Sequence, residues 1–195
     1  MKKLVYLIAV SAAVFTFQSC KNSAKDSKGV ADSLNKVKDT TSNVNATGGI
    51  AVEPSDAEFA TKAAAGGLAE VELGRLALTK TTNAKLLKFA NMMISDHGKA
   101  NEELAGIAKK KNITLPAALD KDHEQKKDEL SKKSGKDFEK AYTDAMVDGH
   151  KKTLKLMQDE SKEGKDADLK AFALKTTSIV QTHLDTINMI HDSMK

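Results

Sequence analysis

The sequence has few of the residues that mark a particular chemistry. Among its 195 residues are one cysteine, two prolines and no tryptophan. A single cysteine excludes redox chemistry that needs a cysteine pair, and no glycine-rich loop is present that would bind a nucleotide phosphate. With so few prolines and many Ala, Leu, Lys, Glu and Met residues, the composition favours an all-helical fold.

A strong excess of one charge is also lacking. The formal net charge is +4, and Lys2 and Lys3 at the N-terminus contribute two of these charges. Positive and negative residues alternate along the chain and form no basic stripe. We therefore expect no nucleic-acid partner.

The N-terminus has the pattern of a bacterial lipoprotein signal. Residues 1–3 include two lysines, and the 14 residues 4–17 are mostly apolar, which is too short to span a bilayer comfortably. The small residue Ser19 directly precedes Cys20, the only cysteine. We expect residues 1–19 to be a cleaved signal peptide and Cys20 to carry the lipid anchor. The alternative is an ordinary secretory signal that leaves Cys20 as an unpaired thiol.

The segment after this signal, residues 20–54, is predicted to be a flexible tether. It is rich in Ser, Lys, Asn, Asp, Thr and Gly and has few apolar residues. Such a composition does not bury enough apolar surface to order the chain. The sequence thus predicts a membrane-anchored protein of the cell envelope, with its folded domain in residues 55–195.

The folded domain shows the periodicity of four long amphipathic helices. Apolar residues recur at spacings of three and four, which is typical of the inward face of a bundle helix. Ser55 and Glu58 form a capping-box pattern at the start of the first helix. The predicted helices begin at Ser55, Asn83, Asp137 and Asp166.

A long connection separates the second helix from the third. Residues 112–136 contain Pro116, Gly135 and a polar, helical piece around residues 123–133. A connection of this length crosses a bundle instead of making a tight hairpin. We therefore predict an all-α four-helix bundle with a long crossover that carries a short extra helix.

One polar residue interrupts the apolar stripe of each predicted helix near its middle. These residues are Glu70, His97, His150 and His183. Mid-helix positions meet at one depth in an antiparallel bundle, so a carboxylate and three imidazoles are expected to converge. Such a set suits zinc, copper, iron or manganese. Met93 and Met146, each four residues before a histidine, would add thioether ligands and favour copper.

The same residues also fit a core without a metal. Methionines at helical spacing usually pack against other side chains, and a hydrogen-bonded Glu–His network would satisfy the polar groups. Burial of Glu70 without any partner would cost several kcal/mol. A metal site and a metal-free structural or interaction module therefore both stay open.

A catalytic di-iron site is disfavoured. Di-iron bundle proteins repeat a glutamate three residues before a ligand histidine. The corresponding residues here are Ile94, Val147 and Val180. We assign no catalytic residue, and an enzyme such as a metal-dependent oxidase is the less favoured class. Asp96 and Asp148 rotate away from the stripe and are expected to support the site from outside or to face solvent, whereas His123 and His191 are expected to be peripheral.

Several short motifs resemble a known family. They are Glu58-Phe59, Gly66 to Gly74, Phe89-Ala90 with Met93, Asp96-His97, Tyr142 with Met146 and His150, Leu169 to Ala173, and His183-Leu184. On these motifs, residues 55–191 resemble the bacterial domain-of-unknown-function family 4142. The resemblance implies a ferritin-like fold and an envelope location, with the outer membrane favoured and the domain facing the periplasm. It identifies neither an activity nor a protein partner, and both stay unknown, although the four polar mid-helix residues fall on motif positions.

Overall fold

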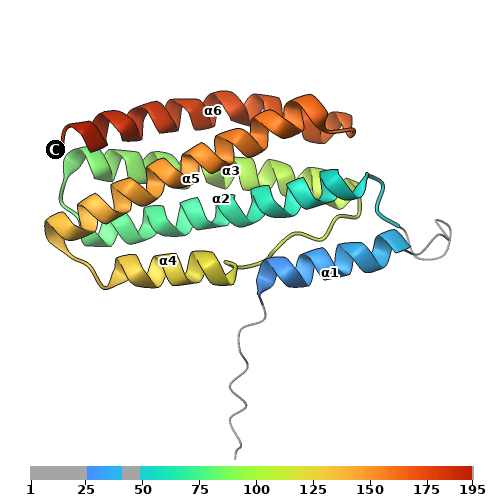
Figure 1. Ribbon diagram of the computed structural model, residues 1–195, viewed down its shortest axis with the longest axis horizontal. Helices are drawn as coiled ribbons and strands as arrows, with labels where there is room; N and C mark the ends of the chain where they lie inside the picture. Colours follow the sequence, from blue (N-terminus) through green and yellow to red (C-terminus); the bar gives the residue numbers. More distant parts are fainter. Residues whose placement is uncertain (1–25, 41–48, 195) are drawn as a thin grey trace, which may run out of the picture.

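The computed structural model describes residues 26–40 and 49–194, and all regular secondary structure in these residues is helical (Figure 1). The helices are α1 (Ser27–Thr40), α2 (Pro54–Lys80), α3 (Ala84–Lys110), α4 (Lys121–Ser131), α5 (Gly135–Glu163) and α6 (Ala167–Asp192). The predicted all-helical class is confirmed. None of the helices in the described residues is both long and apolar enough to cross a membrane. The predicted signal peptide, residues 1–19, and Cys20 lie outside the described residues.

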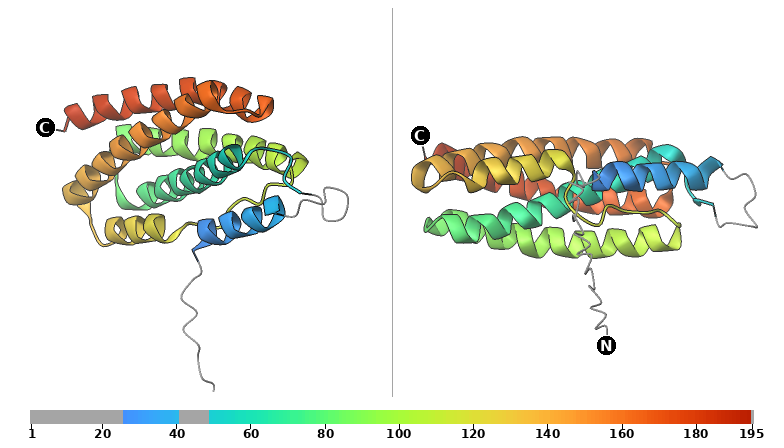
Figure 2. Two further views of the ribbon diagram at one scale, coloured as in Figure 1. Left: turned by 45° about the vertical axis from the view of Figure 1, so that its right-hand side comes forward. Right: turned by 90° about the horizontal axis from the view of Figure 1, so that it is seen from below.

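The four long helices lie side by side in two antiparallel pairs. Helix α2 packs along α3, and α5 packs along α6, while contacts of α3 with α6 and of α2 with α5 join the pairs. The connection from α3 to α5 returns along the length of these helices and contains α4 (Figure 1). Helices α1 and α4 lie along the same side of the four long helices, next to α2 (Figure 2).

Local sequence explains the starts of α3 and α6. The side chain of Asn83 accepts a hydrogen bond from the backbone N–H of Lys85, and the side chain of Asp166 accepts from those of Asp168 and Leu169. Side-chain oxygens at this position satisfy N–H groups that have no partner within the helix. Both starts agree with the sequence prediction.

The start of α2 differs from the prediction. The helix begins at Pro54, with Glu53 as its N-cap and without a side-chain cap, so the predicted capping box of Ser55 and Glu58 is wrong. Proline suits the first turn because its missing N–H has no helical partner there. The nearby Asp56 is fully buried, and its carboxylate accepts hydrogen bonds from the backbone N–H groups of Lys165 and Asp166. This side chain therefore ties α2 to the α5–α6 turn.

Helix α1 occupies part of the segment predicted to be a flexible tether. Its side chains contact the rest of the protein mainly through polar groups. The Asn35 amide donates to the carbonyl of Thr114 at 2.9 Å and accepts from the N–H of Thr114 at 2.7 Å. The hydroxyl of Thr61 in α2 donates to Asp32 at 2.6 Å. Because these contacts are polar, the low apolar content of the segment did not reveal a docked helix.

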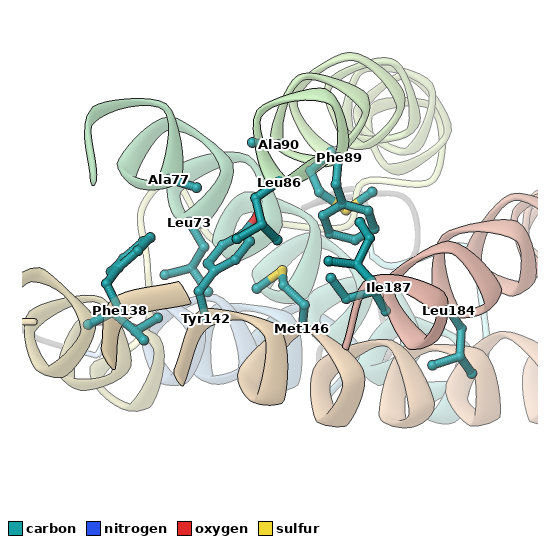
Figure 3. Packing of buried hydrophobic residues seen from close by; sticks show 13 residues of the cluster. Leu73, Ala77, Leu86, Phe89, Ala90, Phe138, Tyr142, Met146, Leu184 and Ile187 are labelled. Carbon is teal, nitrogen blue, oxygen red and sulfur yellow. The ribbon is translucent and has the colours of Figure 1, made fainter. Parts of the chain in front are cut away.

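Two apolar clusters fill the interior, one toward each end of the long helices. One contains Leu73, Leu86, Met146 and Ile187, among other residues, and Figure 3 shows these side chains meeting from α2, α3, α5 and α6. The other is built around Phe59, Leu104, Met157, Leu169 and Phe172. Along every long helix, the polar mid-helix residue falls between the segments that contribute to the two clusters. Apolar packing on both sides thus limits the access of water along the helix axes to this level.

Candidate metal centre

The structure brings three of the four predicted site residues together. His97, His150 and His183 come from α3, α5 and α6 and are 5%, 0% and 1% exposed. The ring centres of His97 and His150 are 5.7 Å apart, those of His97 and His183 5.2 Å, and those of His150 and His183 5.6 Å. The imidazoles therefore form a nearly equilateral triangle.

Hydrogen bonds fix the orientation of two of these rings. Nδ1 of His150 lies 2.8 Å from the carbonyl oxygen of Met146, and Nε2 of His183 lies 3.1 Å from a carboxylate oxygen of Asp96. Because a carbonyl and a carboxylate can only accept, both ring nitrogens must carry the proton. The lone pairs of the neutral rings are thus on Nε2 of His150 and Nδ1 of His183.

Those two nitrogens, together with Nε2 of His97, are buried and have no hydrogen-bond partner among the described residues. One potential ligand nitrogen from each ring lies within 4.8 Å of the other two. A buried polar atom without a partner costs about 1–3 kcal/mol. Three such lone pairs at one level of the protein are a candidate donor set for a cation.

The electrostatics of the site keep the rings of His97 and His183 unprotonated. Burial, with smaller effects of His150 and His183, lowers the pKa of His97 to about 3. Burial also lowers the pKa of His183, although its hydrogen bond to Asp96 opposes this effect. Both imidazoles are therefore neutral near pH 7, which is the form that binds a metal.

Glu70 lies beside the triangle. Its Oε1 atom is 3.7 Å from Nδ1 of His150, and its Oε2 atom is buried without a hydrogen-bond partner among the described residues. Burial raises the pKa of this carboxyl, and the charges of His150 and His123 act against that increase. The carboxylate therefore faces the side of His150 that is turned away from the free Nε2.

The other predicted residues divide between the core and the periphery. Met93 and Met146 are fully buried and belong to one of the apolar clusters. His191 is partly exposed, and its Nε2 lies 3.1 Å from Asp144. His123 is also partly exposed, and its Nδ1 lies 2.7 Å from Asp120, the N-cap of α4.

Asp96 is a further residue of the site, and Tyr142 has a buried polar group in the neighbouring apolar cluster. Asp96 bonds to His183 from the neighbouring helix, and the sequence left open whether it supports the site or faces solvent. Tyr142 is fully buried, and its hydroxyl has no hydrogen-bond partner among the described residues. Burial and the nearby Glu70 raise the pKa of Tyr142. In the sequence, Tyr142 stood out as part of a family motif with Met146 and His150, which gave no sign of its unpaired hydroxyl.

Comparison with known proteins gives a family and a related fold. The family model for Domain of unknown function (DUF4142) matches residues 40–190. Among solved structures, the crystal structure of a DUF305 fragment from Deinococcus radiodurans is similar, with a TM-score of 0.66 and 9% sequence identity. The similarity covers 73% of this chain and 98% of that chain, and at such low identity it shows the fold alone. No curated protein matches the sequence.

Proposed function

This chain belongs to the family Domain of unknown function (DUF4142), and from the geometry of its buried histidines we propose that it binds a transition-metal ion. The ligands are Nε2 of His97, Nε2 of His150 and Nδ1 of His183. The triangle of the three rings carries this proposal. At metal–nitrogen distances of about 2.0–2.1 Å, the centres of three bound imidazoles lie roughly 5.2–5.6 Å apart. The corresponding distances here are 5.2, 5.6 and 5.7 Å.

Charge balance also supports a cation at this position. Three neutral imidazoles leave the charge of a bound ion uncompensated in a buried region, which is costly. Glu70 and Asp96, each beside one ligand histidine, supply two carboxylates that offset it. A carboxylate that accepts the outer N–H of a ligand histidine also raises the basicity of that ring, which is the role given to Asp96.

The donor set favours some metals over others. Imidazole suits zinc, copper and iron, whereas manganese prefers carboxylate and water oxygens. Three protein ligands leave a fourth position open, as in catalytic zinc sites. The sulfur atoms of Met93 and Met146 are packed in the apolar cluster, so the proposed ligand set needs no thioether.

A metal-free polar core is the alternative. It would require hydrogen bonds that link Glu70 to the three rings. The distance of 3.7 Å from Glu70 to Nδ1 of His150 is too long for such a bond, and that nitrogen already donates to Met146. The network is therefore not closed, which favours the metal-binding function.

Metal content measured by mass spectrometry on protein purified without chelators tests this proposal. We expect about one zinc, copper or iron ion per chain, and its loss in the double variant His97→Ala, His183→Ala. His191→Ala is the matched control, because it removes a histidine outside the triangle. A cobalt titration of the unaltered protein needs no variant, and the intense visible bands of a four-coordinate ion should saturate at one equivalent. Absence of both the ion and these bands would refute the proposal.

We further infer that Cys20 is lipidated and that the domain is held at an envelope membrane, with a ferritin-like bundle formed by the four long helices. The apolar run that ends before Cys20 supports the anchor, and the two antiparallel pairs with a crossover support the bundle. On α1, close to Cys20 in sequence, Val30, Leu34 and Val37 are 40%, 47% and 63% exposed. Fatty-acid labelling in cells should mark the protein and be lost in Cys20→Ser, and labelling that persists would refute the anchor.

A further inference from the structure

A pocket leads from the surface to Glu70. Its volume is about 340 Å³, and it lies between α1, α2, α5 and the start of α4. The residues that line it include Lys28, Lys62, Gly66, Glu70, His123 and Gly149. A metal ion with six waters occupies roughly 200 Å³, at about 30 Å³ per water, so the pocket is large enough for a hydrated ion.

Two glycines on facing helices keep this pocket open above Glu70. A Cβ atom at Gly149 would lie 3.1 Å from Oε1 of Glu70, so a side chain there would crowd the carboxylate. A Cβ atom at Gly66 would have only Thr153 near it, at 4.0 Å, so a longer side chain there would extend into the open space. The same Oε1 atom is 3.7 Å from Nδ1 of His150, so the Glu70 carboxylate and the His150 ring lie between the pocket and the free Nε2, and an ion must pass this ring to enter the triangle.

The pocket contains side chains that can bind a metal ion at its mouth and at its floor. At the mouth, Nδ1 of His123 donates to Asp120 at 2.7 Å, which leaves Nε2 as the lone-pair nitrogen of the neutral ring. At the floor, Oε2 of Glu70 is buried without a hydrogen-bond partner among the described residues. Of the three lysines at the rim, Lys28 forms an ion pair with Asp32 and Lys62 forms one with Glu58, which reduces their repulsion of a cation, whereas Lys152 has no such partner among the described residues.

We propose that this pocket is the loading port through which a metal ion reaches His97, His150 and His183, with His123 and Glu70 as transit ligands. The proposal rests on the metal binding proposed above. It gives α1 and α4 a role, because they form the outer walls of the port while the four long helices carry the ligands. A port residue acts on the rates of loading and release, whereas a ligand acts on affinity.

Stopped-flow mixing with zinc, followed by release to a chelator, tests the port in the full chain. Gly66→Leu should slow association and dissociation at least tenfold and leave Kd unchanged, and His123→Ala should slow association a few-fold. Gly106→Leu in α3 is the matched control, because nothing lies within 4 Å of a Cβ atom there. It should keep the parent rates.

The outcomes separate the two proposals. If zinc binds the parent and Gly66→Leu with the same association rate, the port is overturned and metal binding stays intact. Slower loading in Asp96→Asn, together with parent rates in Gly66→Leu, would overturn it in favour of a route between α3 and α6. A parent that binds no zinc overturns metal binding, and the port falls with it.

Discussion

Asp96 of α3 holds His183 of α6 in place, with 3.1 Å between its carboxylate oxygen and Nε2 of the imidazole. This bond turns Nδ1 of His183 into the free nitrogen and links two helices at the level of the triangle. Outside the triangle, His191 of α6 and Asp144 of α5 form a similar pair, with the same distance of 3.1 Å between Nε2 and the carboxylate oxygen. The two pairs therefore differ in whether the histidine is a proposed ligand.

The two carboxylates Asp96 and Asp144 allow a matched test of whether His183 is a ligand. Asp96→Asn keeps the shape of the side chain but removes the charge that raises the basicity of His183. Loss of such a partner typically weakens metal affinity about 10–100-fold. Zinc Kd values from chelator competition should show this loss for Asp96→Asn and none for Asp144→Asn. Equal Kd values in both variants would mean that His183 is not a ligand.

Acid should destabilise the metal-free protein through His97. The pKa of His97 is about 3 in the folded protein, against 6.5 for an unperturbed histidine. Below pH 6.5 His97 takes up a proton in the unfolded chain but not in the folded protein. The contribution of neutral His97 to the free energy of unfolding is therefore fully present above pH 6.5 and is lost progressively as the pH falls toward 3. The slope is at most about 1.4 kcal/mol per pH unit.

Urea unfolding of metal-free protein at pH 7, 6 and 5 measures this slope. His97→Gln should lose less stability than the parent over this range, whereas the control His191→Gln should follow the parent. Other groups titrate equally in parent and variant, so the difference isolates His97. A parent and a His97→Gln variant with parallel pH profiles would contradict a neutral, buried imidazole.

Glu160 should make the stability of the fold depend on pH in the opposite direction. Burial, followed by the charges of Asp56 and Asp166, raises the pKa of Glu160 from 4.5 to about 7. Its protonated form therefore stabilises the fold below pH 4.5, and this contribution is lost as the pH rises through 7. Glu160→Gln should stabilise the protein at pH 8 by on the order of 1–2 kcal/mol and have little effect at pH 4.5. Thermal melts at both pH values measure this effect, with Glu163→Gln at an exposed position as the control. Equal changes in the two variants would contradict a raised pKa of Glu160.

The contribution of Asn35 tests the docking of α1. Its amide makes two hydrogen bonds to the backbone of Thr114, and the side chain is 6% exposed. Asn35→Ala should weaken docking by about 1–3 kcal/mol because it leaves these backbone groups without partners. Hydrogen exchange should then quicken across α1 and not in α3, while the exposed Ser33→Ala should have little effect. Unchanged exchange in Asn35→Ala would mean that other contacts hold the helix.

Periodicity was sufficient to predict the helical class and the convergence of three histidines. His97, His150 and His183 each lie on an apolar stripe near mid-helix, and packing of those stripes brings them to one level. Sequence spacing did not predict that Glu70 would lie beside His150 and not inside the triangle. Nor did it reveal the bond from Asp96, because a residue turned away from the stripe on its own helix can still reach a neighbouring one.

Polar tertiary contacts account for the other differences. Asp56 lies between Ser55 and Glu58 of the predicted capping box, but its carboxylate accepts hydrogen bonds from backbone N–H groups more than 100 residues later in the chain. Similarly, α1 docks through Asn35 and Asp32, and a local pattern of apolar residues carries no information about such partners. Both contacts join segments that are distant in sequence.

Anomalous X-ray diffraction at the zinc edge, on crystals grown with zinc and without chelators, would locate the proposed ion. We expect one strong peak about 2.0–2.1 Å from Nε2 of His97, Nε2 of His150 and Nδ1 of His183. A triangle without anomalous density, or peaks confined to surface groups such as His191 and Asp144, would contradict the proposed site.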